Sequence, residues 1–159
     1  MAALPVILVA EDRLDDIELI KRALERAKVS SAMYFVRDGE ETIAYLEGER
    51  CYANREEYPL PDLLLLDLKM PRMDGFDVLA WIRRQPRLRT LRVVVLTSSE
   101  EVRDINLAYE LGANSFLVKP LDFEDFARLG EFITNYWLRW DSAPQTSRVP
   151  WDPKSAQRP

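Results

Sequence analysis

Five short apolar segments alternate with segments of helical periodicity, and this alternation limits the possible folds more than any other feature of the chain. The apolar segments cover residues 5–10, 32–37, 62–66, 92–96 and 115–118. Between them, apolar side chains recur at helical spacing, as at Leu14, Ile17, Ile20 and Leu24. Strands that alternate with helices are typical of an α/β domain with right-handed crossovers. We therefore predict a doubly wound, five-stranded parallel sheet with helices on both faces.

Local signals predict where several helices begin or end. Pro86 should stop the third helix, and Gly112 should end the fourth in a left-handed conformation. Asp122 should cap the last helix. The run Ser98–Glu101 is similar to a capping box, which predicts that the fourth helix starts there.

Acidic side chains and one lysine follow three of the predicted strands. Asp67 ends the apolar run Leu63–Leu66, Glu11 and Asp12 follow the first strand, and Lys119 follows the last. The carboxyl ends of parallel strands meet at one edge of the sheet, where such folds bind ligands. An acid that ends a buried strand is costly unless it has a partner. The pattern predicts a site that holds a hard cation beside a phosphorylatable carboxylate.

These residues resemble the response-regulator receiver domains of bacterial two-component signalling. The resemblance covers about residues 4–138. It rests on the acid pair, the run Asp67–Gly75, Thr97 at a strand end and the dipeptide Lys119-Pro120, in the expected order. It implies a flavodoxin-like sheet with strand order 2-1-3-4-5. It also implies a single-domain response regulator, not a classical enzyme, that accepts a phosphoryl group from a sensor histidine kinase. Its output would be protein–protein contact or onward phosphotransfer.

The resemblance assigns roles at the metal site. Asp67 would be the phosphoacceptor, forming an aspartyl phosphate. Asp12, Asp67 and the backbone carbonyl of Lys69 would bind Mg²⁺ or Mn²⁺, and Glu11 would act mainly through water. An all-oxygen ligand set suits such a cation.

The resemblance also assigns the groups around the phosphoryl group. Lys119 would pair with one oxygen, while the Thr97 hydroxyl and the backbone N–H of Ser98 would bind others. Thr97 and Phe116 occupy the switch positions, and Phe116 has no hydroxyl, so switching would act through packing. Lys69 and Ser99 lie where side chains control water access, which leaves the lifetime of the phosphoryl group open.

Each residue also has a structural interpretation. Asp12 could only favour the positive end of the first helix, and Glu11 could be a solvated acid. Thr97 could be an ordinary β-branched strand residue, and Lys119 a surface lysine. Asp67 is different, because it closes a continuous apolar run.

Three other functions fit less well. A haloacid-dehalogenase-type phosphatase needs a second acid two residues after the nucleophile, where this chain has Lys69. A flavodoxin-like cofactor binder needs a glycine-rich loop after the first strand, and none is present. A pseudo-receiver that serves only as an interaction module would not need the acids, Thr97 and Lys119.

Composition excludes further classes of function. The chain has no histidine, so it offers no histidine base, no histidine-ligated zinc site and no phosphohistidine. A net charge of −5 argues against non-specific nucleic-acid binding. The single Cys51 fits a reducing cytoplasm, and no run is long enough to cross a membrane.

Two segments lie outside the minimal pattern. We expect residues 49–61 to form a helix extension and a solvated loop, with a partner-specific surface as the alternative. Residues 139–159 contain four prolines and predict an extended tail, too short for an effector domain.

Aromatic residues crowd the last helix. Tyr136, Trp137 and Trp140 spread around it, more than one buried stripe can absorb, which predicts an exposed interface. We expect a homodimer through the fourth helix, the fifth strand and the last helix, with Trp151 of the tail docked across the partner. The run Asn135–Leu138 resembles the ends of regulators that pair with phytochrome-like sensor kinases.

Overall fold

The computed structural model describes residues 4–28 and 31–140, with side chains as far as Leu138. Its core is a sheet of five strands, β1 (Val6–Ala10), β2 (Ala32–Val36), β3 (Leu63–Leu66), β4 (Arg92–Thr97) and β5 (Ser115–Val118). The order is β2-β1-β3-β4-β5, and all four pairs are parallel. The predicted fold class and strand order are therefore confirmed.

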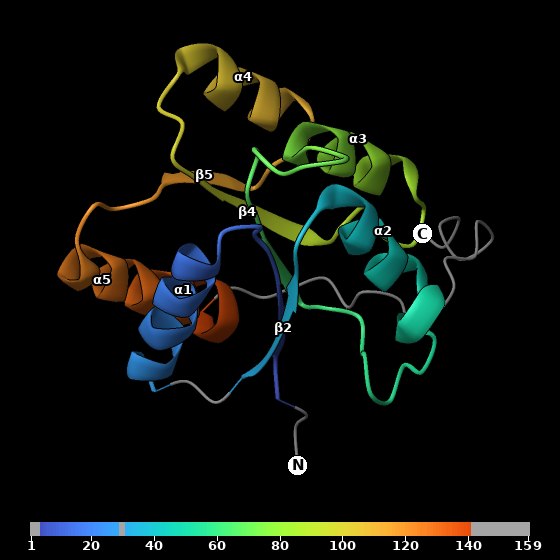
Figure 1. The fold of residues 1–159 in the computed structure, drawn as a ribbon, viewed down its shortest axis with the longest axis horizontal. Helices are drawn as coiled ribbons and strands as arrows, with labels where there is room; N and C mark the ends of the chain where they lie inside the picture. Colours follow the sequence, from blue (N-terminus) through green and yellow to red (C-terminus); the bar gives the residue numbers. More distant parts are fainter. Residues whose placement is uncertain (1–3, 29–30, 141–159) are drawn as a thin grey trace, which may run out of the picture.

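Helices cover both faces of the sheet. They are α1 (Leu14–Arg26), α2 (Gly39–Glu47), α3 (Gly75–Arg84), α4 (Val102–Glu110) and α5 (Phe123–Ile133). α1 and α5 lie on one side of the sheet, and α2, α3 and α4 on the other (Figure 1). Alternate residues of β1 point to opposite faces of the sheet. Leu8 packs against the α2–α3 side, and Ile7 packs against the α1–α5 side.

Three of the four predicted helix ends are confirmed. α3 ends at Arg84, just before Pro86, and Gly112 follows α4 with a φ of 102°. Asp122 caps α5, because its carboxylate accepts the amide of Asp125 at 2.8 Å.

The predicted capping box at Ser98–Glu101 is wrong. α4 begins at Val102, and its N-cap residue, Glu101, makes no side-chain capping bond. Because β4 continues through Thr97, residues 98–101 are needed to carry the chain away from the sheet edge. The Ser99 hydroxyl instead donates to Asp104 at 2.6 Å and accepts the Glu101 amide at 3.3 Å.

The helix extension predicted for residues 49–61 is wrong, and although many of these residues are exposed as predicted, others pack against the domain. α2 stops at Gly48, which has a φ of 72°, and a short 3₁₀-helix, η1 (Arg50–Tyr52), follows. The ring of Tyr52 is buried and lies 5.0 Å from that of Tyr45. Arg55 donates to the carbonyls of Tyr45 and Leu46, both at 2.7 Å, and so satisfies the end of α2. The segment is therefore part of the packed domain.

The C-terminal aromatic residues divide between core and surface. A π-helix, η2 (Thr134–Trp140), continues α5. Trp137 is buried under the guanidinium of Arg92, whereas Phe132 and Tyr136 stack on each other, about half exposed. From residue 141 on, the predicted tail, with Trp151, lies outside the described residues, as does the side chain of Trp140. Within residues 4–28 and 31–140, no helix is long and apolar enough to cross a membrane.

Candidate functional site

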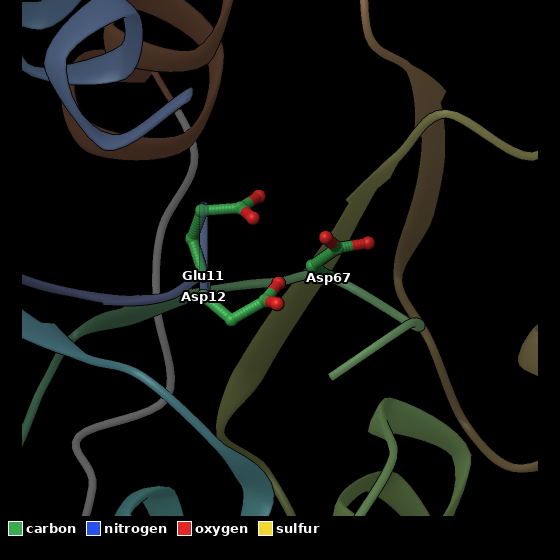
Figure 2. A group of neighbouring side chains, drawn as sticks. All are labelled: Glu11, Asp12 and Asp67. Atoms are coloured by element: carbon green, nitrogen blue, oxygen red, sulfur yellow. The ribbon is translucent and has the colours of Figure 1, made fainter. Parts of the chain in front are cut away.

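Three carboxylates meet at the carboxyl ends of two neighbouring strands. Ala10 of β1 pairs with Leu66 of β3, so the residues that follow each strand leave the sheet side by side. The amide of Asp67 donates to the carbonyl of Ala10 at 3.0 Å and fixes this register. One oxygen from each of Glu11, Asp12 and Asp67 lies within 4.8 Å of the others, and the side chains gather at one point (Figure 2).

Lys119 reaches the same point from the end of β5. Its amide donates to the carbonyl of Thr97 at 2.7 Å, which sets where the side chain leaves the sheet. Its ammonium donates to Asp67 at 3.1 Å, to Asp16 at 2.9 Å and to Glu11. The side chain is only 5% exposed, which excludes the alternative interpretation of Lys119 as a surface lysine and places it in a buried ion-pair network.

The electrostatics of the cluster follow from this burial. Burial and the nearby charge of Asp67 raise the pKa of Glu11 to about 7, although hydrogen bonds from Lys119 and the Arg13 amide oppose the rise. Burial alone would lower the pKa of Lys119, but its bonds to Glu11 and Asp16 and the charge of Asp67 raise it above its usual value. Lys119 is therefore a fixed positive charge among an excess of acids.

Two buried oxygens at the site have no hydrogen-bond partner among the described residues: Asp12 Oδ1 and Thr97 Oγ1. Buried polar atoms are nearly always paired, so orphaned oxygens mark positions where a ligand belongs. The carboxylates of Glu11, Asp12 and Asp67 form an all-oxygen donor set that fits a divalent cation. Thr97, at the end of β4, could donate to an anionic oxygen.

The loop after β3 is held close to the strand end. A Cβ atom on Gly75 would lie 2.3 Å from the carbonyl oxygen of Asp67, so only glycine lets α3 start this near. Asp74 caps α3 by accepting the amide of Asp77 at 2.9 Å. Earlier in the same loop, Arg72 pairs with Asp38, the N-cap of α2, at 2.7 Å.

Of the remaining predicted residues, Lys69 and Ser98 follow the ends of β3 and β4, whereas Phe116 lies within β5. Lys69 is exposed, and its amide points at Asp67 Oδ1 at 3.4 Å. Ser98 is exposed and directly follows β4. Phe116 of β5 is half-buried against the α3–α4 side of the core.

Two contacts of the site are absent from the sequence-based prediction. Asp16 binds Lys119, and the hydroxyl of Tyr109 accepts the amide of Phe116 at 3.1 Å. The place of Asp16 in the first turn after the acid pair could have suggested its role. Nothing in the sequence indicates the bond between α4 and β5.

Comparisons of the sequence with a family model and with known proteins identify regulators as its relatives. A family model for the response regulator receiver domain matches residues 7–129. The chain is 41% identical to the probable methanogenesis regulatory protein FilR2 of Methanothrix harundinacea over 139 residues, 87% of each chain. It is 35% identical to response regulator Rcp1 of Synechocystis, covering 87% of this chain and 92% of Rcp1.

Solved structures agree with this match. The phosphorylated cyanobacterial phytochrome response regulator RcpA superposes with a TM-score of 0.83 at 38% identity, covering 89% of this chain and 99% of RcpA. The Mn²⁺-bound form of Rcp1 superposes with a TM-score of 0.80 at 35% identity, covering 88% of this chain and 99% of that structure.

Proposed function

The chain belongs to the response regulator receiver domain family, the phosphoacceptors of two-component signalling, and we propose that Asp67 accepts its phosphoryl group. One observation carries the assignment. Asp67 ends the fully buried strand β3, and its carboxylate lies both within the acid cluster and 3.1 Å from Lys119. Glu11 and Asp12 follow β1, whereas Asp67 follows β3, the central strand of the sheet.

The residues around Asp67 suit phosphoryl transfer from a histidine kinase. An oxygen of Asp67 forms the new bond to phosphorus as the bond from phosphorus to the kinase's histidine nitrogen breaks, and the imidazole leaves with that electron pair. Lys119, the orphaned Thr97 hydroxyl and the Ser98 amide stabilise the charge on the phosphoryl oxygens. Phosphorylation of Asp67 then changes how Phe116 and Thr97 pack.

We propose that the divalent cation is Mg²⁺, or Mn²⁺ in its place. Glu11, Asp12, Asp67 and the carbonyl of Lys69 are the proposed ligands. When bound, the cation neutralises charge between the carboxylates and the phosphoryl oxygens. The Mn²⁺-bound form of Rcp1 supports a site of this kind. Phosphorylation by small-molecule donors and hydrolysis of the aspartyl phosphate are expected to require it.

The cognate kinase is proposed to be of the phytochrome type, in the cytoplasm. The support is the similarity to RcpA, a cyanobacterial phytochrome response regulator. The exposed, unpaired Cys51 fits a reducing compartment.

Output is proposed to pass through a homodimer formed by the face of α4, β5 and α5. Exposed apolar side chains occur on each of the three elements and on η2: Val102, Tyr109, Val118, Phe132 and Tyr136. Exposed apolar groups that form a contiguous patch commonly mark an interface.

Acetyl phosphate with Mg²⁺ tests the assignment of Asp67. Intact-mass spectrometry should show one added phosphoryl group on the wild type and none on Asp67→Asn. Full labelling of the Asn variant would refute it. Asp62→Asn is the control, because Asp62 lies at the opposite end of β3, where it accepts the amide of Val6 at 2.8 Å.

A further inference from the structure

Lys119 uses all of its donor capacity in the described structure. An ammonium group has three N–H donors, and those of Lys119 go to three carboxylates: Glu11, Asp16 at 2.9 Å and Asp67 at 3.1 Å. Two of these carboxylates belong to the acid cluster that fits a divalent cation. The third, on Asp16, comes from the first turn of α1 and is not part of that cluster.

The three partners differ in what happens to them during the proposed reaction. A divalent cation bound by the acid cluster would compete with Lys119 for the oxygens of Glu11 and Asp67 and would repel the ammonium. Phosphorylation then converts one oxygen of Asp67 into the bridging oxygen of an acyl phosphate. Asp16 takes no part in either event, so its carboxylate stays available to Lys119 throughout.

Because both side chains are shielded from solvent, the bond between Lys119 and Asp16 is important for the position of the ammonium. Lys119 is 5% exposed and Asp16 is 15% exposed, so the pair is shielded from solvent. A buried ammonium without a partner is costly and would turn away from the site. The only other ion pair of Asp16 among the described residues is to Arg13 at 3.9 Å, and Arg13 is 67% exposed. Asp16 is therefore not committed elsewhere.

We propose that Asp16 is a positioning residue that anchors Lys119 beside Asp67 while the cation and the phosphoryl group occupy the other two carboxylates. The inference rests on the proposed function, because it assigns a role within the same site. The N–H of Lys119 that points at Asp67 becomes the donor to the phosphoryl oxygen, and Asp16 holds the ammonium in place from the side of α1.

The test compares three variants. Asp16→Asn removes the charge, and Asp16→Glu restores it on a longer side chain. Asp15→Asn is the matched control, since Asp15 is an exposed neighbour in the same turn and the change in charge is identical. The rate of labelling by acetyl phosphate is measured over a range of donor concentrations at saturating Mg²⁺.

We expect Asp16→Asn to lower the maximal rate about tenfold, because a misplaced catalytic group typically costs at least this factor. The half-saturating donor concentration should stay the same or fall, since a negative charge near an anionic donor is gone. Asp15→Asn should match the wild type, and Asp16→Glu should recover part of the rate. An Asp16→Asn variant that labels as fast as or faster than the wild type would show that Asp16 only competes for Lys119.

A second measurement does not depend on phosphorylation. Ammonium protons of a lysine are visible by ¹⁵N-edited NMR while hydrogen bonds protect them from exchange, and Lys119→Arg assigns the signal. The signal should persist in Mg²⁺ for the wild type and Asp15→Asn but vanish for Asp16→Asn. If the ammonium signal persists in Asp16→Asn when calorimetry shows that this variant binds Mg²⁺, Asp16 does not anchor Lys119. A wild type that binds Mg²⁺ but takes no phosphoryl group would refute the proposed function, while this signal still decides the role of Asp16.

Discussion

Replacing Asp12 with Asn should have opposite effects on the stability of the protein in the absence and presence of Mg²⁺. Asp12 lies in a cluster where one oxygen from each of three carboxylates is within 4.8 Å of the others, and its Oδ1 is buried without a partner. Without a cation, ionised Asp12 is repelled by Asp67, and the Asn side chain removes that repulsion. With a cation, the same change removes a ligand.

The geometry sets the size of both effects. Two unit charges at 4.8 Å repel by about 1 kcal/mol in a water-like dielectric, and more where the site is partly buried. Asp12→Asn should therefore raise the free energy of unfolding by about 1 kcal/mol in metal-free buffer. In the wild type, Mg²⁺ at about ten times its dissociation constant should add about 1.4 kcal/mol, because it binds the native state alone. For a domain of this length, that corresponds to a rise of about 4 °C in the melting temperature.

Thermal unfolding in a chelator and in a millimolar Mg²⁺ series measures both quantities. The melting temperature of the wild type should rise with Mg²⁺. The melting temperature of Asp12→Asn should be higher than that of the wild type in chelator and should change little with Mg²⁺. Asp15→Asn serves as the control for a change of charge at the same end of α1. Two results would refute the reasoning: an Asp12→Asn variant that responds to Mg²⁺ like the wild type, or one that is less stable than the wild type in chelator.

Three further predictions concern the frame around the site. Asp38→Ala should cost about 1–2 kcal/mol at pH 7 in urea unfolding, because it removes the cap of α2 and the partner of Arg72. Burial raises the pKa of Asp38, but the Glu41 amide and Arg72 lower it by more, so the net pKa is below its usual value. The stabilisation by ionised Asp38 is therefore present above the usual carboxyl pKa and is lost as the pH falls. The difference in stability between Asp38→Ala and the wild type should shrink as the pH falls towards 3, and a constant difference would contradict the assignment. Gly75→Ala should destabilise the protein by about 2 kcal/mol and slow labelling, since the new Cβ atom would meet the Asp67 carbonyl; unchanged melting and labelling would count against the close approach. Replacing Phe132 and Tyr136 with Ser should weaken a micromolar dimer seen by light scattering, and a strictly monomeric wild type would rule that interface out.

Local patterns in the sequence predict much of this fold. The strands β1 and β3 are continuous apolar runs because both faces of the sheet are covered there, so these runs could be recognised without knowing their neighbours. Proline, glycine and a capping aspartate act over a few residues, which is why the ends of α3, α4 and α5 were predicted correctly. The acid cluster follows from the same logic, since parallel strands place the residues after β1, β3 and β5 at one edge.

Other features depend on contacts between residues far apart in the chain. The start of α4 was predicted too early, because the preference of Ser98–Glu101 for a cap was outweighed by the length of chain needed to leave β4. Residues 49–61 have the composition of a loop, but Tyr52 and Arg55 find partners on α2 that no local pattern shows.

The sequence by itself determined which residues end the strands, and so which acids and which lysine the site contains. Only the tertiary structure decided how they are paired. Lys119 and Asp16 are 103 positions apart, and their bond exists because α1 packs beside the carboxyl end of a sheet whose last strand supplies the lysine. Periodicity carries information about burial along one element, whereas an ion pair between two elements is fixed by their relative position, which the packing of the whole domain sets.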